Sequence, residues 1–146
     1  MKKLLILALV SFAFTSCGIT SSLYYWGGMQ NGATTYENLA YKNYDKQTPE
    51  SLCKLICMYE DIVSNPGGTR RMPPPGICAE YGYILLIPEN AAIFAEHATA
   101  IQRRTFASGD YASFFPEKGK EMLQKEIELY PESAKFIAPL IERLCK

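Results

Sequence analysis

The stretch TPESLCKLICMYEDIVS, from Thr48 to Ser64, decides the fold. Thr48 is a typical helix N-cap, Pro49 suits the first helical position, and the acid that follows lies where the helix dipole favours negative charge. Apolar side chains then recur at helical spacing, at Leu52, Leu55, Ile56, Tyr59, Ile62 and Val63. The pattern predicts an amphipathic helix that ends before Asn65-Pro66-Gly67-Gly68, with Cys53 and Cys57 off the centre of the apolar stripe.

Helical spacing continues from this stretch to the C-terminus. Pro75 is expected to open the next helix, in which Gly82 allows close approach of a neighbour. A further helix follows Pro88, and Ser108-Gly109-Asp110-Tyr111 indicates a turn with a fresh helix start. Pro116 then restarts a helix that runs to Tyr130, and the last helix begins at Pro131. The inward faces predicted for these helices are Ile77, Cys78, Tyr81, Ile84 and Leu85; Phe94, His97, Ala98 and Ile101; Met122, Leu123, Ile127 and Tyr130; and Phe136, Ile137, Leu140, Ile141 and Leu144.

Aromatic residues dominate the segment before Thr48. Leu23-Tyr24-Tyr25-Trp26 ends at a glycine pair, Asn31-Gly32 indicates a turn, and Thr34 or Thr35 is positioned to cap a tyrosine-rich helix. Two interpretations stay open: a stacking surface for glycan or peptide, or aromatics packed on the helical body with their hydroxyls reaching water. The side chains concerned are Tyr24, Tyr25, Trp26, Tyr36 and Tyr41.

No alternating apolar and polar pattern of the kind that strands require occurs in the chain. The predicted fold class is therefore all-α, a short array of antiparallel helix hairpins that follows the N-terminal and aromatic segments.

The N-terminus is typical of a lipoprotein signal peptide. Lys2 and Lys3 precede an apolar run from Leu4 to Phe14, and small residues stand directly before Cys17. The run is too short to span a bilayer as a helix, which takes about 20 residues. We expect residues 1–16 to be removed, Cys17 to carry the lipid, residues 17–22 to form a tether, and residues 23–146 to form a single helical domain.

Lipidation predicts where the protein works. Two or three acyl chains hold a protein stably on a membrane. Gly18 follows the cysteine in place of the Asp that retains many lipoproteins at the inner membrane, so we expect an outer-membrane protein that faces the periplasm.

Composition argues against several functional classes. Basic and acidic residues balance in the full chain, and no basic stripe supports nucleic-acid binding. His97 is the only histidine, and its spacing is typical of a structural core residue. No nucleophile motif accompanies it. We therefore expect no catalytic residue, no metal site, no cofactor and no enzymatic activity.

Four cysteines remain after Cys17, at Cys53, Cys57, Cys78 and Cys145. In an oxidising envelope they are able to form up to two disulfides, with three possible pairings. Buried free thiols are the other interpretation, and the sequence does not choose between the two.

Two helix-pair motifs stand in the second half of the chain. Ala79-Glu80-Tyr81-Gly82-Tyr83 suits a first helix, and the segment from Gly109-Asp110-Tyr111 to Tyr130-Pro131-Glu132-Ser133 suits a second. The pair resembles a tetratricopeptide repeat, in which a small residue lets the helices pack closely. The resemblance implies one divergent unit over residues 75–133, with an insertion near residues 88–108.

The order of motifs along the chain also resembles a family of bacterial lipoproteins. These motifs are the cysteine of the signal peptide, Leu23-Tyr24-Tyr25-Trp26-Gly27, Thr48-Pro49-Glu50-Ser51-Leu52 and Tyr130-Pro131-Glu132-Ser133. They are similar to those of the lipoproteins grouped as domain of unknown function 4810. That resemblance implies a part in an envelope complex, beside a curli-secretion-like lipoprotein and a second small lipoprotein, and it transfers no catalytic residue.

The leading functional prediction is an outer-membrane-anchored, non-catalytic interaction module that binds another envelope lipoprotein or a secretion component. The alternative is a ligand-binding lipoprotein that recognises cell-wall glycan or peptide through the five aromatic residues named above.

Overall fold

The computed structural model describes residues 22–145, so the signal peptide and Cys17 lie outside the described residues. Helices account for most of this part of the chain, and the all-α prediction is confirmed. The elements are β1 (Met29–Gln30), β2 (Ala33–Thr34), α2 (Thr35–Lys46), α3 (Pro49–Ser64), α4 (Ile77–Leu86), α5 (Pro88–His97), α6 (Ala100–Arg103), α7 (Tyr111–Leu129), the 3-10 turn η1 (Pro131–Ser133) and α8 (Ala134–Leu144).

Side-chain caps begin the first two helices, as the sequence predicts. The Thr48 hydroxyl accepts the Ser51 backbone N–H, and the Ser51 hydroxyl accepts the Thr48 N–H in return. Thr34 and Glu37 form the same reciprocal arrangement at α2. Each pair satisfies two backbone donors that have no partner inside the helix.

A two-stranded hairpin precedes α2, where the sequence pattern predicts no strand. β1 pairs with β2 antiparallel across the predicted turn at Asn31-Gly32. Both turn residues have positive φ, 54° and 82°, which a two-residue hairpin turn of this kind requires. Strands of two residues are too short to show an alternating pattern, so only the turn is visible in the sequence.

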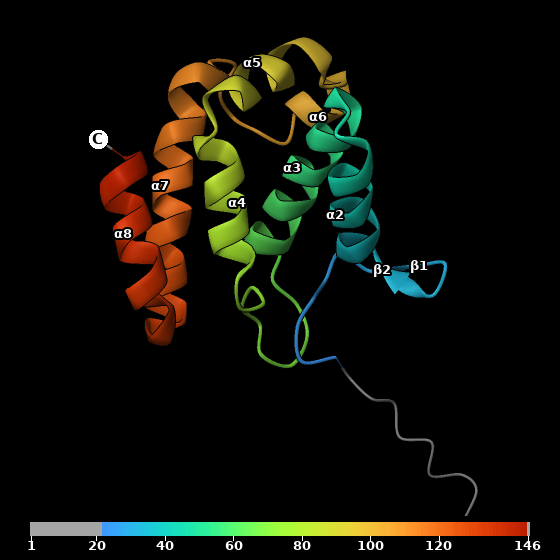
Figure 1. Ribbon diagram of the computed structural model, residues 1–146. Coiled ribbons are helices and arrows are strands. Elements are labelled where there is room, and N and C mark those ends of the chain that lie inside the picture. Colours follow the sequence, from blue (N-terminus) through green and yellow to red (C-terminus); the bar gives the residue numbers. More distant parts are fainter. Residues whose placement is uncertain (1–21, 146) are drawn as a thin grey trace, which may run out of the picture.

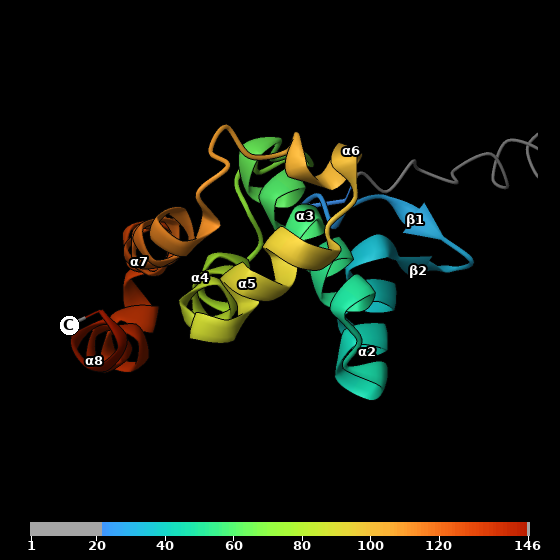
Figure 2. The ribbon, with the colours of Figure 1, turned by 90° about the horizontal axis from the view of Figure 1, so that it is seen from above.

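The helices form two layers (Figures 1 and 2). α2, α4 and α8 lie in one layer, and α3 and α7 lie behind them in the other. Contacts join α2 to α3, α4 to α7 and α7 to α8, and the helices of each pair run in opposite directions. The helices expected to form the tetratricopeptide-like pair, α4 and α7, share the most extensive contact.

Two glycines allow that close contact. A Cβ placed on Gly82 of α4 would lie 2.7 Å from the Gly119 carbonyl oxygen of α7, and one placed on Gly119 would lie 2.9 Å from the Gly82 carbonyl oxygen. Real side chains do not approach a backbone atom so closely. The prediction that Gly82 permits close approach is confirmed, and Gly119 is its partner.

The segment expected to be an insertion, residues 88–108, supplies part of the core. Phe94 of α5 is fully buried, and its ring centroid lies 5.3 Å from that of Phe106, 5.0 Å from that of Tyr111 and 5.4 Å from that of Phe115. α5 also contacts both α3 and α7. The segment is therefore built into the hydrophobic centre that α7 completes.

Some predicted inward positions are wrong. His97 is the last residue of α5 and is exposed, and Thr99 caps the new helix α6, so Ile101 is out of phase with α5 and is exposed too. Phe136 is also exposed, since α8 buries Ile137 instead. Cys53, expected beside the stripe, is fully buried in the core.

Two prolines that were expected to begin or restart a helix do not do so, although the helix start expected at Ser108-Gly109-Asp110-Tyr111 is confirmed. α4 begins at Ile77 because Gly76 takes a left-handed φ of 87°, and Pro75 lies in the turn before it. α7 begins at Tyr111, capped by Asp110, and continues through Pro116. Since Pro116 is close to the N-terminus of α7, the missing backbone donor affects only the first turns.

Candidate interaction surface

The five aromatic residues predicted as a binding surface do not form one surface. Trp26 packs on Tyr36 with ring centroids 5.2 Å apart. The Tyr36 ring centroid lies 6.1 Å from that of Tyr59, and the Tyr59 centroid lies 5.7 Å from that of Tyr81. We call Trp26, Tyr36, Tyr59 and Tyr81 the aromatic ladder. It leads from the half-buried N-terminal segment into the core, so its rings join elements rather than present a stacking face.

Carboxylates accept the hydroxyls of this ladder. Tyr36 and Tyr59 each donate to Glu80 Oε2 at 2.7 Å, and Tyr81 donates to Glu60 Oε2 at 2.7 Å. Burial, together with the neighbouring carboxylates, raises the pKa of all three tyrosines well above the ordinary phenol value. These phenols therefore stay protonated and act as structural donors that tie α2 and α3 to α4.

Tyr25 and Tyr24 are also engaged with the body. The Tyr25 hydroxyl donates to Asp61 at 2.9 Å, and this bond raises the pKa of Tyr25. Tyr24 is half-buried and lies beside Tyr130, whose own hydroxyl donates to the Pro73 carbonyl oxygen at 2.7 Å. Of the two interpretations of the aromatic segment, packing on the helical body describes Tyr24, Tyr25, Trp26 and Tyr36.

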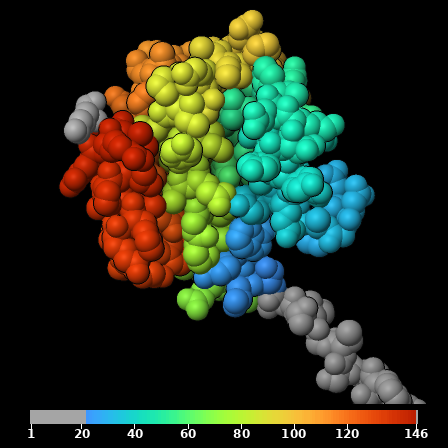
Figure 3. All heavy atoms as spheres, viewed as in Figure 1, coloured from blue at the N-terminus to red at the C-terminus, as the bar shows by residue number. Residues whose placement is uncertain are grey.

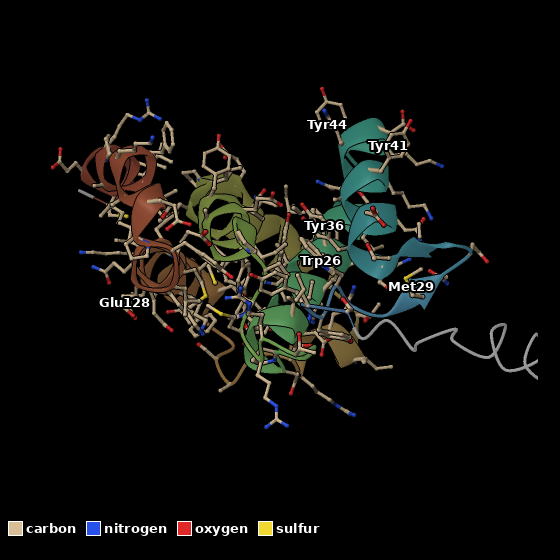
Figure 4. All side chains as sticks on the ribbon, turned by 90° about the horizontal axis from the view of Figure 1, so that it is seen from below. Trp26, Met29, Tyr36, Tyr41, Tyr44 and Glu128 are labelled. Atoms are coloured by element: carbon tan, nitrogen blue, oxygen red, sulfur yellow. The ribbon has the colours of Figure 1, made fainter. Side chains whose placement is uncertain are left out.

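Tyr41 is the exception among the five. Its side chain is 76% exposed on α2, and Tyr44, one turn further along the same helix, is 82% exposed. Figure 4 shows both at the far end of α2 from Trp26 and Tyr36, pointing away from the body. Tyr44 is not among the residues that the sequence predicts for the site, although its spacing of three from Tyr41 places it on the same side of the helix.

A groove between α2 and α4 lies beside Tyr44. We call it the α2–α4 groove, and Figure 3 shows the face on which these two helices meet. Tyr44 and the half-exposed Tyr83 of α4 stand on it from opposite sides. Its lining is Asn43, Tyr44, Gln47, Thr48, Pro49, Leu52, Tyr83, Ile84, Ile87, Asn90 and Ile93.

The groove combines apolar walls with a few side-chain amides. The Asn90 amide donates to the Ile84 carbonyl oxygen at 2.7 Å, which fixes it in place. The Asn43 side-chain oxygen accepts the Ser51 hydroxyl at 2.9 Å, so the Asn43 NH₂ group is the part that is able to donate to a ligand. Apolar walls with few oriented polar groups are the usual composition of a recognition site.

The four described cysteines are free thiols in the structure. Cys53 and Cys78 are buried. Burial raises the pKa of Cys57 to about 11 and that of Cys78 to about 12. Since the thiolate is the reactive form, these thiols are poor nucleophiles near neutral pH. Cys57 and Cys145 are only half-buried, so the interpretation as buried free thiols describes Cys53 and Cys78, and disulfide pairing in an oxidising envelope stays a prediction.

No group of three metal-ligating side chains comes together within residues 22–145. His97 lies on the surface, 3.7 Å from Glu96, and does not line the α2–α4 groove. In the same part of the chain, no helix is both long and apolar enough to cross a membrane.

Comparison with known proteins adds no relative. No protein-family model matches the chain, and searches of curated proteins and of solved structures found no match. The resemblance to the lipoproteins of domain of unknown function 4810 stays a prediction from the motifs alone.

Proposed function

We propose that this protein is a lipid-anchored, non-catalytic interaction module of the cell envelope, and that it binds an extended segment of a partner lipoprotein or secretion component in the α2–α4 groove. The observation that carries the proposal is the pair Tyr44 and Tyr83 on the two sides of an apolar groove. Tyrosine is enriched at protein interfaces because one ring offers both apolar area and a hydrogen-bonding hydroxyl.

The groove chemistry supports a peptide as the bound group. Leu52, Ile84, Ile87 and Ile93 offer apolar contact to side chains, while the tyrosine hydroxyls and the Asn43 amide are able to pair with backbone groups of a peptide. The Tyr36 hydroxyl on Glu80 ties the first turn of α2 to the first turn of α4, and the Tyr59 hydroxyl ties α3 to the same carboxylate. A binding site between helices fixed in this way needs little reordering when the partner binds.

Site-specific photocrosslinking in the bacterial envelope tests the proposal. A photoreactive phenylalanine analogue at Tyr44 or at Tyr83 should give one adduct with the same envelope protein. The control position is Gln124, which is exposed on α7 in the other layer. Equal adducts at all three positions, or no adduct at Tyr44 and Tyr83, would contradict the proposal.

The alternative, recognition of cell-wall glycan or peptide, depends on Tyr41. This residue lines a shallow, open depression on α2 with Glu37, Asn38 and Tyr44. Stacking of a sugar ring on an exposed tyrosine fits such a surface. Sedimentation with purified peptidoglycan distinguishes the two, because glycan binding should weaken in Tyr41→Ala and be unaffected by Tyr83→Ala.

A further inference from the structure

One end of the molecule is built from the first described residues and the loop between α3 and α4. The Thr69 N–H donates to the Ser22 carbonyl oxygen at 3.1 Å, and the Arg70 N–H donates to the Leu23 carbonyl oxygen at 3.0 Å. Figure 1 shows this loop beside the N-terminal segment, at the end of the molecule opposite α5 and α6. The backbone pairing fixes where the chain enters the folded body.

Gly68 allows the backbone of the loop to lie close to the backbone of the N-terminal segment. A Cβ at Gly68 would lie 2.6 Å from the Leu23 carbonyl oxygen, and one at Gly67 would lie 3.0 Å from the Tyr25 Cβ. The loop and the N-terminal segment are thus packed backbone to backbone. We call the surface formed by Leu23, Arg70 and Arg71 the basal surface.

The basal surface is apolar and basic. The Leu23 side chain is 59% exposed, and both arginines are exposed. The loop from residue 65 to residue 76 contains no acid, and neither arginine forms an ion pair within residues 22–145. Asp61, near the end of α3, is engaged by the Tyr25 hydroxyl and the Asn65 amide.

Other acids toward this end lie on α2, α4, α7 and η1. Glu37 and Glu80, in the first turns of α2 and α4, are exposed but accept hydrogen bonds, Glu37 from Thr34 and Glu80 from the hydroxyls of Tyr36 and Tyr59. Glu128 and Glu132, on α7 and η1, are exposed. Figure 4, seen from this end, shows Glu128 across the molecule from Met29 and the start of the described chain. At this end of the molecule, the basic charge therefore lies on the side where the N-terminal segment enters the folded body.

The chain between Cys17 and the basal surface is short. Ser22 follows Cys17 by five positions, and an extended chain covers at most roughly 3.6 Å per residue, so this linker spans no more than about 18 Å. A lipid on Cys17 would hold Ser22 within that distance of the bilayer surface, with Leu23 and the two arginines next to it.

We propose that the basal surface docks on the headgroups of an anionic phospholipid bilayer, with Arg70 and Arg71 on lipid phosphates and Leu23 at the interface. The proposal depends on the lipid anchor at Cys17 that forms part of the proposed function. Each arginine near an anionic surface strengthens contact roughly fivefold. Docking turns α5 and α6 away from the membrane and leaves the α2–α4 groove open at the side of the molecule.

Energy transfer from Trp26, the only tryptophan of the chain, tests the docking. The full lipidated protein is placed in vesicles that carry a dansyl-labelled headgroup. Transfer should be about twofold higher on vesicles rich in phosphatidylglycerol than on pure phosphatidylcholine, and high salt should remove the difference. Arg70→Gln with Arg71→Gln, and separately Leu23→Ser, should reduce transfer on the anionic vesicles.

Arg103→Gln with Arg104→Gln is the matched control, because this exposed pair lies at α6, at the other end. It should transfer like the wild type. Equal wild-type transfer on both kinds of vesicle, or wild-type transfer by the Arg70 and Arg71 variant, would overturn the docking. Intact mass of the vesicle-bound protein separates the two proposals: a Cys17 without diacylglycerol overturns the anchor and the docking with it, whereas a lipidated protein with no charge dependence overturns the docking alone.

Discussion

Glu126 is a buried carboxylate that supplies a helix cap from a distant element. Glu126 is only 2% exposed. Its Oε1 accepts the Gly76 N–H at 2.8 Å, at the start of α4, where the helix has no side-chain cap of its own. Its Oε2 is buried and has no hydrogen-bond partner among residues 22–145. Burial raises the pKa of Glu126, although the backbone N–H groups at the start of α4 act in the opposite direction.

This raised pKa makes stability depend on pH. The folded protein holds the Glu126 proton more tightly than the unfolded chain, so the contribution of this group is fully present below the ordinary carboxyl pKa of about 4.5. It is lost as the pH rises through the higher folded pKa. Glu126→Gln keeps an acceptor for Gly76 and removes the titration. Urea unfolding from pH 4 to pH 7 should show a smaller fall in the free energy of unfolding for Glu126→Gln than for the wild type. Parallel pH profiles would show that Glu126 does not titrate in this range.

Gly82 is the residue on which the contact between α4 and α7 depends. A Cβ at this position would meet the Gly119 carbonyl oxygen at 2.7 Å, and that oxygen belongs to backbone with little freedom to move. Gly82→Ala should therefore lower the free energy of unfolding by about 1–3 kcal/mol, the usual cost of overpacking. Gly109→Ala is the control, because nothing lies within 4 Å of its Cβ position. A similar effect of both substitutions in chemical denaturation would contradict this account.

At the scale of elements, α3 depends on the cap that the sequence makes visible. Thr48→Ala should cost about 1 kcal/mol, because the Ser51 N–H loses its side-chain acceptor. Thr99→Ala removes the same kind of cap from α6, a four-residue helix with no buried residue. Its effect on the thermal midpoint should be smaller, and an equal or larger effect would show that α6 contributes more than its packing indicates.

Local signals explain which elements could be predicted from the sequence. The caps at Thr34 and Thr48, the helix start after Ser108-Gly109-Asp110 and the turn at Asn31-Gly32 each depend on residues within four positions, and all are present in the structure. The prediction for Ile101 is wrong because a break at Ala98 changes the phase of the following helix, whereas His97 is exposed as the last residue of α5. Such a break is a tertiary event, since α5 packs on α3 and α7 while α6 contacts α3.

At the scale of the whole molecule, the groove was not predictable from periodicity. Tyr44 and Tyr83 are far apart in sequence and line the same groove only because α2 and α4 lie in the same layer. The sequence does indicate Tyr24, Tyr25, Trp26 and Tyr36 as a group, but Glu80 and Asp61, the carboxylate partners of Tyr36 and Tyr25, come from α4 and α3. The sequence shows that aromatic residues are concentrated before Thr48, whereas the packing of the helices determines which of these side chains face solvent.

The helix pair formed by α4 and α7 should not survive without residues 88–108. If this segment were an addition to a complete repeat unit, a short glycine-serine linker in its place would leave a cooperative fold. Phe94 and Phe106, however, cover Phe115 and Tyr111 of α7, and each large buried aromatic that is lost costs roughly 3–5 kcal/mol. That loss is comparable to the total stability of a typical domain. The shortened chain should therefore show no sharp thermal transition by circular dichroism, while Phe106→Leu, which keeps an apolar side chain in place, should unfold cooperatively at a lower temperature. A sharp transition in the shortened chain would instead support the prediction that residues 88–108 are an insertion.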